Sequence, residues 1–424
     1  MRGLSRESRA LGPLTAQHLL TDACSAGLFV WASDASWHAF LYNFVAFALQ
    51  LPLGWALDAR PWPLRPLLAV SAALLLAGVA LFGATGEPAV SIALACAGNA
   101  LFHVAAGKRL VEEGGGRVAR VGLFISTGAI GLFLGLRFGA AHPFGTVGGA
   151  LAGFMLCLLL FWRMLAERPD APSVARPLTS RPRPLEILAV LLLSALVVWR
   201  SHGVLSATRT FSAVHQALLL GCALTFCSWL GQSLGGVLAD RWGRFRTLGL
   251  SLVGSMALFL LTPYSGIWGW LLLMFLAQLA TGPVLALLFS ACGGRGGLAC
   301  GVNACALFLS TLFFCWPERA LHYFSVDWLA IALEFAATAW VRLPHWFLAL
   351  ACVNMLTHPA LTYAVHRIGY SMPVVASGEL LVVLVEGAVL ALLYRGRAPG
   401  WRMFLVAAWM NAVSYATGVL LFGW

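Results

Sequence analysis

The chain has 424 residues, of which 60% are hydrophobic and only 10% charged, and it carries 17 Trp and 26 Phe. A soluble protein of this length needs far more charge to cover its surface. The composition therefore excludes a soluble protein and indicates a surface that faces lipid. The formal net charge of +11 invites a nucleic-acid interpretation, which the positions of the basic residues argue against.

Continuous apolar segments long enough to span a membrane recur along the chain. A helix needs about 20 apolar residues to cross ~30 Å of hydrocarbon, and these segments do not alternate as the strands of a barrel would. The sequence therefore predicts an all-α polytopic membrane protein with 14–15 helices, within residues 14–33, 38–57, 65–84, 88–107, 121–140, 145–164, 186–205, 214–236, 247–264, 267–289, 297–316, 327–343, 346–365, 374–394 and 403–422.

The basic residues gather in alternate loops. If the N-terminus lies inside, the inner loops hold all of the 27 Lys and Arg except Arg137, Arg200, Arg209, Arg319 and Arg367. This is the positive-inside pattern, so the charge reflects topology and predicts a multi-pass protein with a cytoplasmic N-terminus and a retained first helix. The Arg-, Ala- and Leu-rich composition suggests a bacterial inner membrane. For Arg200, near a predicted outer helix end, we favour extension to the headgroups over attraction of an anionic substrate.

A polar linker divides the chain into two similar parts. Residues 165–185, rich in Pro and Arg, follow the sixth helix and cannot span a membrane. Asp58 and Asp240 each follow the second helix of their part, at an offset of 182, and two Gly-rich stretches repeat at an offset near 178. We interpret this as a duplicated transporter, with an N-terminal bundle at 1–164 and a C-terminal bundle at 186–320.

The remaining residues, 321–424, predict an additional helical module. "FLALACVNMLTH" (347–358) and "FLVAAWMNAVSY" (404–415) align without gaps at an offset of 57. Segment 327–343 is either the twelfth transporter helix or the first helix of this module. Several polar residues of the module lie at membrane depth, where they either fix helix packing, which we favour, or bind a divalent cation or relay protons. These residues are Glu334, Asn354, His358, Glu379, Glu386 and Asn411.

One loop carries a family resemblance. "GGVLADRWGRFR" (235–246) resembles the signature loop of the major facilitator superfamily, G-x-x-x-D-R-x-G-R-[KR]-[KR], from which Phe245 departs. "QHLLTDACSAG", "LYNFVAFALQLPLGWALD", "GNALFHVAAGKRL" and "STGAIGLFLGL" are similar to its fosmidomycin-resistance-like branch, over residues 14–316. The resemblance implies two helical bundles and a conformational latch, which we favour over a plain topological anchor. The latch residues are Gly54, Asp58, Gly236, Asp240, Arg241, Gly243 and Arg244.

Two helices carry polar pairs at membrane depth. His18 and Asp22 share one face of the first helix, and Asn99 and His103 repeat the same spacing on the fourth. Both helices line the central cavity in the resembled fold. A carboxylate beside imidazole can exchange a proton near neutral pH, so we hypothesise that Asp22, His18 and His103 carry a coupling proton. A structural hydrogen-bond cluster is an equally weighted alternative.

Further polar residues could bind a solute through hydrogen bonds, although each could equally join helices. These predicted cavity residues are Tyr42, Asn43, Asn99, Gln216, Gln232, Gln278 and Asn303. The ten cysteines lack CxxC pairs, so we expect neither a disulfide framework nor a metal site.

The predicted function is secondary active transport of a small solute by alternating access, coupled to protons. No Walker-type loop is present, and we expect no enzyme activity and no cofactor. The expected partners are the lipid bilayer, the solute and protons, without nucleic acid; a homo-oligomer or a membrane partner on the C-terminal module stays open. The alternatives are a non-transporting receptor or assembly factor, and an enzyme with a metal in the C-terminal module.

Overall fold

The computed structural model describes residues 10–35, 37–60, 62–113, 117–165, 183–210, 218–312, 331, 333–369 and 371–422, and all regular secondary structure within these ranges is helical. The all-α prediction is confirmed. Eight of the described helices or helix pairs are long and apolar enough to cross a membrane. Predicted residues Gln216 and Arg319, and residues 327–330 and 332 of segment 327–343, lie outside the described residues.

The first bundle contains six predicted spans, all of which form helices. They are α2 (Leu11–Ala32), the run of α3 (Trp37–Asn43), η1 (Phe44–Ala48) and α4 (Gln50–Ala59), then α5 (Leu64–Thr85), α6 (Pro88–Glu113), α7 (Val118–Phe138), and η2 (Phe144–Gly148) with α8 (Gly149–Leu160). η1 and η2 are single π-helical turns, which insert an extra residue into a helical turn and often mark functional positions.

Within the described residues, the second bundle contains counterparts of the first five spans of the first bundle, but its third and fourth spans are divided into helices differently. Its helices are α9 (Pro184–Thr210), α10 (Leu218–Trp242), α11 (Arg244–Gln278), α12 (Thr281–Ala291) and α13 (Gly296–Leu312). The predicted boundary between the helices at 247–264 and 267–289 is a kink at Gly266, where φ is +57°. The second of these two segments is then broken again between α11 and α12, which leaves backbone groups without helical partners.

Two helix pairs make the most extensive contacts between the two bundles. α7 packs on α10, and α4 packs on α13. Both contacts are close because they are built on glycine: a methyl group at Gly122 would lie 2.6 Å from the Gln232 carbonyl oxygen, and one at Gly54 would overlap the Gly297 carbonyl oxygen. Such glycine contacts let two helix backbones approach closely.

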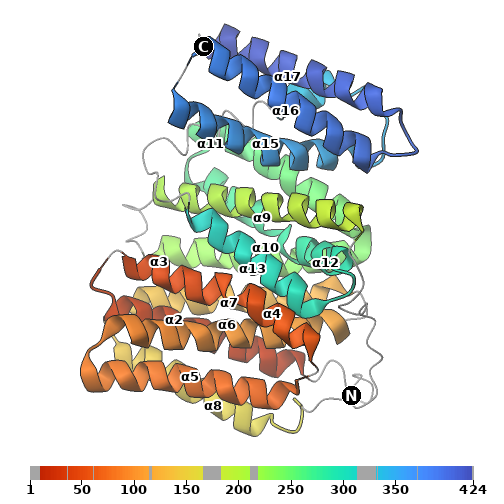
Figure 1. Ribbon diagram of the computed structural model, residues 1–424. Helices are drawn as coiled ribbons and strands as arrows, with labels where there is room; N and C mark the ends of the chain where they lie inside the picture. Colours follow the sequence, from red (N-terminus) through yellow and green to blue (C-terminus); the bar gives the residue numbers. More distant parts are fainter. Residues whose placement is uncertain are drawn as a thin grey trace.

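Three C-terminal helices form a layer beside the second bundle. α15 (Trp346–Ile368), α16 (Met372–Leu393) and α17 (Gly400–Phe422) lie together at the top of Figure 1, above α9. α16 packs between α15 and α17, and α15 contacts α9 and α11. We call these three helices the C-terminal layer.

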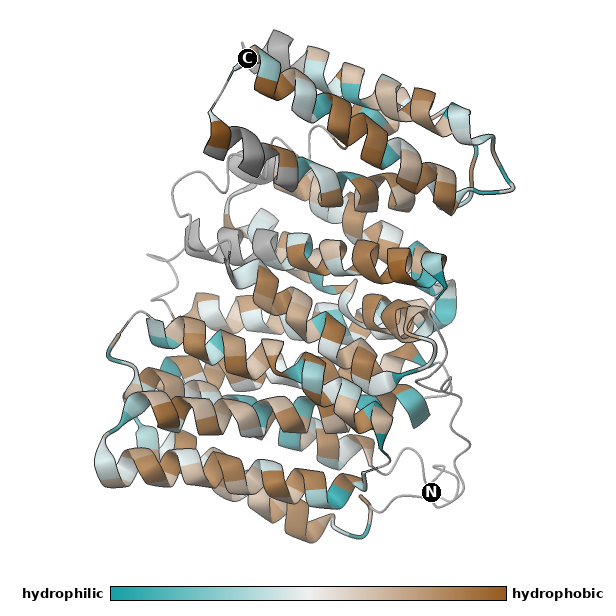
Figure 2. Ribbon diagram, viewed as in Figure 1, coloured by the Kyte–Doolittle hydropathy of each residue, from teal (hydrophilic) through white to brown (hydrophobic). Residues whose placement is uncertain are grey.

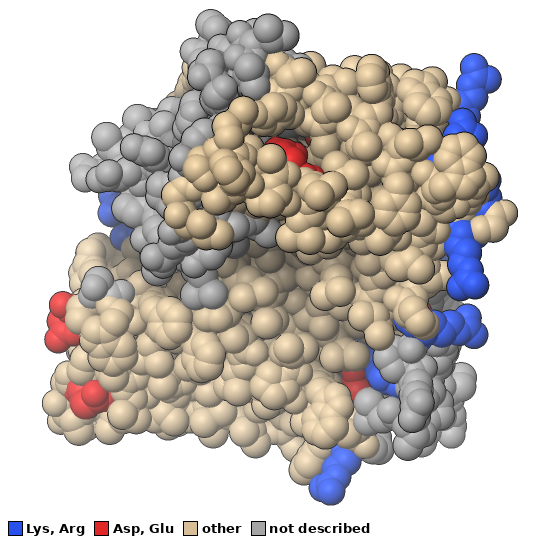
Figure 3. All heavy atoms as spheres, turned by 45° about the horizontal axis from the view of Figure 1, so that its top comes forward, with Lys and Arg blue, Asp and Glu red and all other residues tan. Residues whose placement is uncertain are grey.

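The surface matches a membrane environment. Hydrophobic residues cover the lengths of the helices, while hydrophilic residues concentrate near their ends and in the connecting loops (Figure 2). Large apolar side chains face outward, among them Leu159, which is 72% exposed, and Leu219, which is 84% exposed. Lys and Arg gather along one edge of the molecule (Figure 3), which we call the basic end. This is the segregation that the positive-inside pattern requires.

Candidate functional site: a gate at the basic end and a buried polar centre

Asp240, the acid of the signature loop, bonds to the opposite bundle. It lies near the C-terminal end of α10, and its carboxylate accepts hydrogen bonds from the backbone N–H groups of Val118, at 2.7 Å, and Ala119, at 2.9 Å. These N–H groups begin α7, and the first N–H groups of a helix have no partner within it. The negative charge also lies at the positive end of the α7 dipole. Asp240 therefore joins α10 to α7 at their closest approach.

Asp58 makes the corresponding contact in the other direction. Its carboxylate, near the end of α4, accepts hydrogen bonds from Gly297 N, at 3.1 Å, and Leu298 N, at 2.7 Å, in the first turn of α13. Lys108 of α6 donates to Asp58 Oδ1 and to Glu112 Oε1, at 2.6 Å each. From the sequence Lys108 was counted only as a loop cation, because its partner Asp58 is distant along the chain.

The remaining predicted latch residues differ in how they contribute to the contacts between the two bundles. Gly243 has φ +96° in the turn between α10 and α11, where a side chain would be strained. A methyl group at Gly236 would lie 2.8 Å from the Val118 carbonyl oxygen, so glycine permits the α10–α7 contact. Arg244 donates to Ser290 Oγ at 3.4 Å, and Arg241 is exposed.

Phe245, the residue that departs from the signature, contacts the chain leading into the C-terminal layer. Its ring stacks on His345 with a centroid separation of 4.3 Å. His345 has φ +56°, an unusual value for a non-glycine residue. Both residues line a pocket of about 420 Å³, together with Arg342, Trp346 and Phe347. At Phe245, where the sequence departs from the signature, the loop therefore contacts the segment just before Trp346, the first residue of the C-terminal layer.

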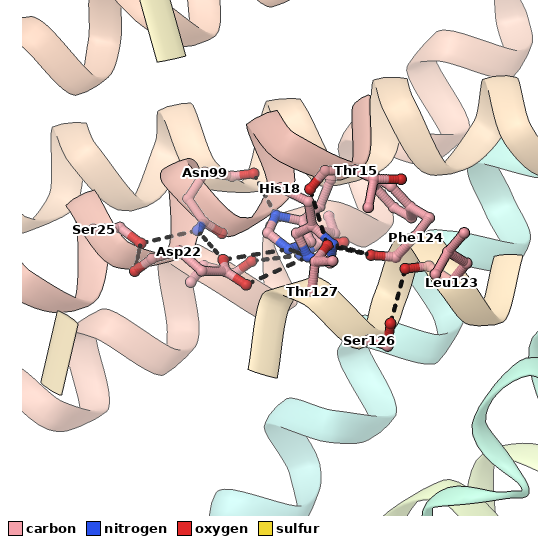
Figure 4. A network of polar contacts seen from close by, with 12 residues as sticks. Thr15, His18, Asp22, Ser25, Asn99, Leu123, Phe124, Ser126 and Thr127 are labelled. Carbon is pink, nitrogen blue, oxygen red and sulfur yellow. Dashed lines mark hydrogen bonds and ion pairs between the residues drawn. The ribbon is translucent and has the colours of Figure 1, made fainter. Parts of the chain in front are cut away.

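The buried polar centre joins α2, α6 and α7 (Figure 4). His18 Nε2 lies 2.7 Å from His103 Nε2. The Asp22 carboxylate lies 3.3 Å from His18 Nε2 and 3.4 Å from His103 Nε2, and Asn99 Nδ2 donates to Asp22 Oδ1 at 2.8 Å. The structure thus brings together the two polar pairs that were predicted on separate helices. We call His18, Asp22 and His103 the central triad.

Both imidazoles of the triad are oriented by backbone carbonyls. His18 Nδ1 lies 2.6 Å from the Phe124 carbonyl oxygen, and His103 Nδ1 lies 2.9 Å from the Asn99 carbonyl oxygen. Since a carbonyl oxygen only accepts, each Nδ1 carries a hydrogen. The two Nε2 atoms therefore face each other and the Asp22 carboxylate.

The equivalent position of the second bundle holds Arg200. It follows His18 at the same offset, 182, that relates the two acids of the helix contacts above. Arg200 Nη1 donates to Thr281 Oγ1 at 2.6 Å, Gln278 Oε1 at 3.1 Å and the Ala277 carbonyl oxygen at 3.3 Å, at the break between α11 and α12. The expectation that Arg200 extends to the headgroups is wrong, because its guanidinium satisfies this helix break.

The predicted cavity residues divide into three groups. Gln232 Nε2 donates to Gln278 Oε1 at 3.0 Å, so these two join the Arg200 cluster. Asn43 donates to its own helix at Ala39 O, and Tyr42 is buried against Phe29. Asn303 is partly buried on α13.

One polar contact between the bundles was not predicted. Ser126 of α7 and Ser233 of α10 are joined by a 2.9 Å hydrogen bond between their hydroxyl groups. A lone serine in an apolar helix is a weak signal, since it so often bonds to its own backbone. This bond adds to the α7–α10 contact made by Asp240.

The polar residues of the C-terminal layer form two contacts. The Glu386 carboxylate accepts from Thr357 Oγ1 and from Asn411 Nδ2, at 2.6 Å each, and so links α15, α16 and α17. Glu334 Oε1 lies 3.6 Å from His358 Nε2. Both glutamates are fully buried.

The two other predicted members do not join these contacts. Asn354 Nδ2 donates to Leu350 O within α15, as Asn411 Nδ2 also does to Ala407 O within α17, so the aligned repeats share one local contact. Glu379 is partly exposed. Figure 3 shows acidic atoms inside a hollow in the upper part of the view.

Comparison with known proteins gives a consistent result for the fold. No protein-family model matches the chain, and no curated protein sequence matches it. Among solved structures, a variant of the E. coli fucose:proton symporter shares 14% identity, with 84% of this chain and 99% of that chain covered and a TM-score of 0.57. The human organic anion transporter MFSD10 shares 16% identity, with coverage of 83% and 100% and a TM-score of 0.58.

A third similar structure is a bacterial homologue of the iron transporter ferroportin in an outward-facing state. It shares 15% identity, with coverage of 84% and 100% and a TM-score of 0.51. Identities this low show the fold and nothing finer. The helix order, the two reciprocal acid contacts and these three neighbours agree, and the chain has the fold of the major facilitator superfamily.

Proposed function

We propose that this protein is a secondary active transporter that moves a small solute by alternating access between its two bundles. The observation that carries the proposal is the reciprocal pair of contacts from Asp58 to α13 and from Asp240 to α7. Each acid reaches across to the helix start of the other bundle. Separating the bundles at this end breaks both contacts together, so the pair acts as a two-state gate.

The gate is closed at the basic end. The positive-inside rule supports a cytoplasmic location for this end, and we propose a bacterial inner-membrane protein whose N-terminus is cytoplasmic. A closed cytoplasmic gate belongs to an outward-facing or occluded state, as in the ferroportin homologue above. Lys108 strengthens this closed state, because its ammonium lies between Asp58 and Glu112 and reduces their mutual repulsion.

The central triad holds the coupling proton. Two bare Nε2 lone pairs at 2.7 Å repel each other, so a hydrogen must lie between His18 and His103. With both Nδ1 atoms also protonated, one imidazole is cationic, and the adjacent Asp22 carboxylate balances that charge. The central triad thus shares one additional proton. Its residues lie on helices that, in the resembled fold, line the central cavity.

Proton movement in proteoliposomes tests this function. With a pH-sensitive dye inside the vesicles, a transported solute should move protons in the wild-type protein, and Asp22→Asn should abolish that movement while the protein stays folded. Asp34→Asn is the matched control, because Asp34 pairs with His38 at an exposed loop. Unchanged proton movement in Asp22→Asn would remove the triad from the mechanism.

The same proposal extends to the organisation of the chain. The short stretches quoted above support membership of the fosmidomycin-resistance-like branch. The proposal includes an added module at 321–424, although the match to the symporter covers 84% of this chain and so leaves a smaller part uncovered than this module contains. Its internal contacts, centred on Glu386, favour a packing role, and its outer face is available for a homo-oligomer or a membrane partner.

A further inference from the structure

The central triad has the composition of a metal site. Two imidazoles and one carboxylate come from α2 and α6, and their ligand atoms all lie within 4.8 Å of one another. Within the described residues, no other group of three such side chains converges in this way. Two histidines with one carboxylate suit divalent first-row transition metals, whereas Mg²⁺ and Ca²⁺ prefer oxygen ligands alone.

The ligand atoms already face inward, held by their surroundings. The Phe124 and Asn99 carbonyl oxygens accept from the two Nδ1 atoms, which leaves both Nε2 lone pairs directed into the triad. Asn99 also fixes one oxygen of Asp22. Metal-binding histidines in proteins are oriented in this way, by a hydrogen bond from the second ring nitrogen.

The distances approach those of a tetrahedral site. Ligands about 2.1 Å from a metal are separated by about 3.4 Å. Asp22 Oδ2 lies 3.3 Å from His18 Nε2, and the other carboxylate oxygen, Oδ1, lies 3.4 Å from His103 Nε2. The Nε2–Nε2 distance of 2.7 Å suits a shared hydrogen and would have to lengthen to about 3.4 Å when a metal replaces it.

Gly128 leaves space at the triad. A methyl group there would lie 2.5 Å from His18 Nε2 and 2.6 Å from Asp22 Oδ2, on the side chains of two of the three proposed ligands. The Asp22 and His103 side chains are 14% and 20% exposed, which gives the site an approach. Three protein ligands also leave a fourth position open, as suits an ion that must be released.

We propose that His18 Nε2, His103 Nε2 and an Asp22 oxygen bind a divalent first-row transition-metal ion, and that this ion is the transported solute. The identification as solute rests on the transport function proposed above, whereas the binding site does not. The hydrogen between the two Nε2 atoms leaves as the metal enters, because both use the same lone pairs.

Cobalt binding to the full-length protein tests the site. Protein purified in detergent, stripped with EDTA and freed of it, should bind one Co²⁺ per chain, with the visible absorption of a nitrogen- and oxygen-coordinated ion, and Zn²⁺ should displace it. His18→Ala, His103→Ala and Asp22→Asn should each weaken binding by about 100-fold or more. His142→Ala, an exposed histidine, is the control and should bind as the wild type does.

Gly128→Ala separates a built site from loss of folding. It retains all three ligands but fills the space between them, so it should weaken Co²⁺ binding while the unfolding midpoint and elution volume show a folded protein. Absence of stoichiometric Co²⁺ binding to the wild type would overturn the proposal. So would binding that the three ligand variants leave unchanged.

Flux separates this inference from the proposed function. Metal uptake into proteoliposomes that is lost in Asp22→Asn supports both. Stoichiometric binding without uptake keeps the metal site and overturns the ion as solute. Proton-coupled movement of another solute, by a protein that binds no metal, overturns the inference and keeps the transport function.

Discussion

Asp58 and Asp240 occupy matching positions in the two bundles, and each accepts hydrogen bonds from two N–H groups at the start of a helix in the opposite bundle. The arrangement is reciprocal: α4 is held to α13, and α10 is held to α7. One bundle therefore cannot move away at this end without breaking contacts made by acids of both bundles.

Replacing either acid should open the gate. Asp240→Asn loses the charge and replaces one acceptor by a donor that faces an N–H group, at a cost of about 1.5–3 kcal/mol. The population of the cytoplasm-closed state should fall roughly tenfold to a hundredfold relative to the open state. Distances between spin labels on α7 and α10 would measure this shift. Asp34→Asn should leave the distribution unchanged, and an unchanged distribution in Asp240→Asn would contradict the gate.

The glycine contacts make a separate prediction. Gly54→Ala places a methyl group against the Gly297 carbonyl oxygen, so α4 and α13 can no longer close together. Cysteines introduced near Gly297 should then react faster with a thiol reagent supplied from the cytoplasmic side. The matched control is Gly83→Ala in α5, where no atom lies within 4 Å of the added methyl group. The control should be neutral or slightly stabilising, since Ala is a better helix former by about 1 kcal/mol.

Glu386 should stabilise the C-terminal layer. Glu386→Ala removes the acceptor that links Thr357 to Asn411 and leaves each donor only an acceptor in its own helix, Val353 O and Ala407 O, so we expect a loss of about 1–3 kcal/mol in total. The thermal unfolding midpoint in detergent should fall by several degrees. Glu379→Ala, on the same helix but partly exposed, should change it much less. Equal effects of the two variants would argue against a packing role for Glu386.

Phe245 should link the signature loop to the C-terminal layer. Phe245→Lys restores the residue type of the family signature but removes the stacking on His345, a contact of about 0.5–1.5 kcal/mol beyond its buried area. We expect faster proteolysis between residues 339 and 345 with little change at the gate. Phe245→Tyr retains the ring and should behave as the wild type does. If Phe245→Lys and the wild type were cleaved at the same rate, the stacking of Phe245 on His345 would not stabilise residues 339–345.

The sequence predicted the helices well, because apolar length and turn residues are local signals. Spans such as 65–84 and 88–107 begin within a residue or so of α5 and α6. The break between α11 and α12 was missed, since the segment is apolar throughout and the break is stabilised by Arg200, which lies far earlier in the chain than its acceptor Ala277. A local pattern contains no information about such a distant donor.

The site was predicted in part for the same reason. The i, i+4 pairs on two helices identified His18, Asp22, Asn99 and His103, but their convergence depends on how α2 packs against α6. Lys108 was not recognised as a gate residue because its link to Asp58 crosses helices. The repeat offset already present in the sequence would have paired His18 with Arg200, had it been applied to polar residues as well as to the loops.

That pairing has a consequence for the protein's ancestry. If the two bundles derive from one duplicated unit, matching places now hold an imidazole, which exists in neutral and charged forms, and a guanidinium, which stays charged. The halves have ceased to be interchangeable, and a step that needs a charge to appear or vanish can originate in only one of them. Exchanging the two residues would place a permanently charged guanidinium next to Asp22. On this reasoning we expect the two bundles still to fold but the proton-coupled step to be lost.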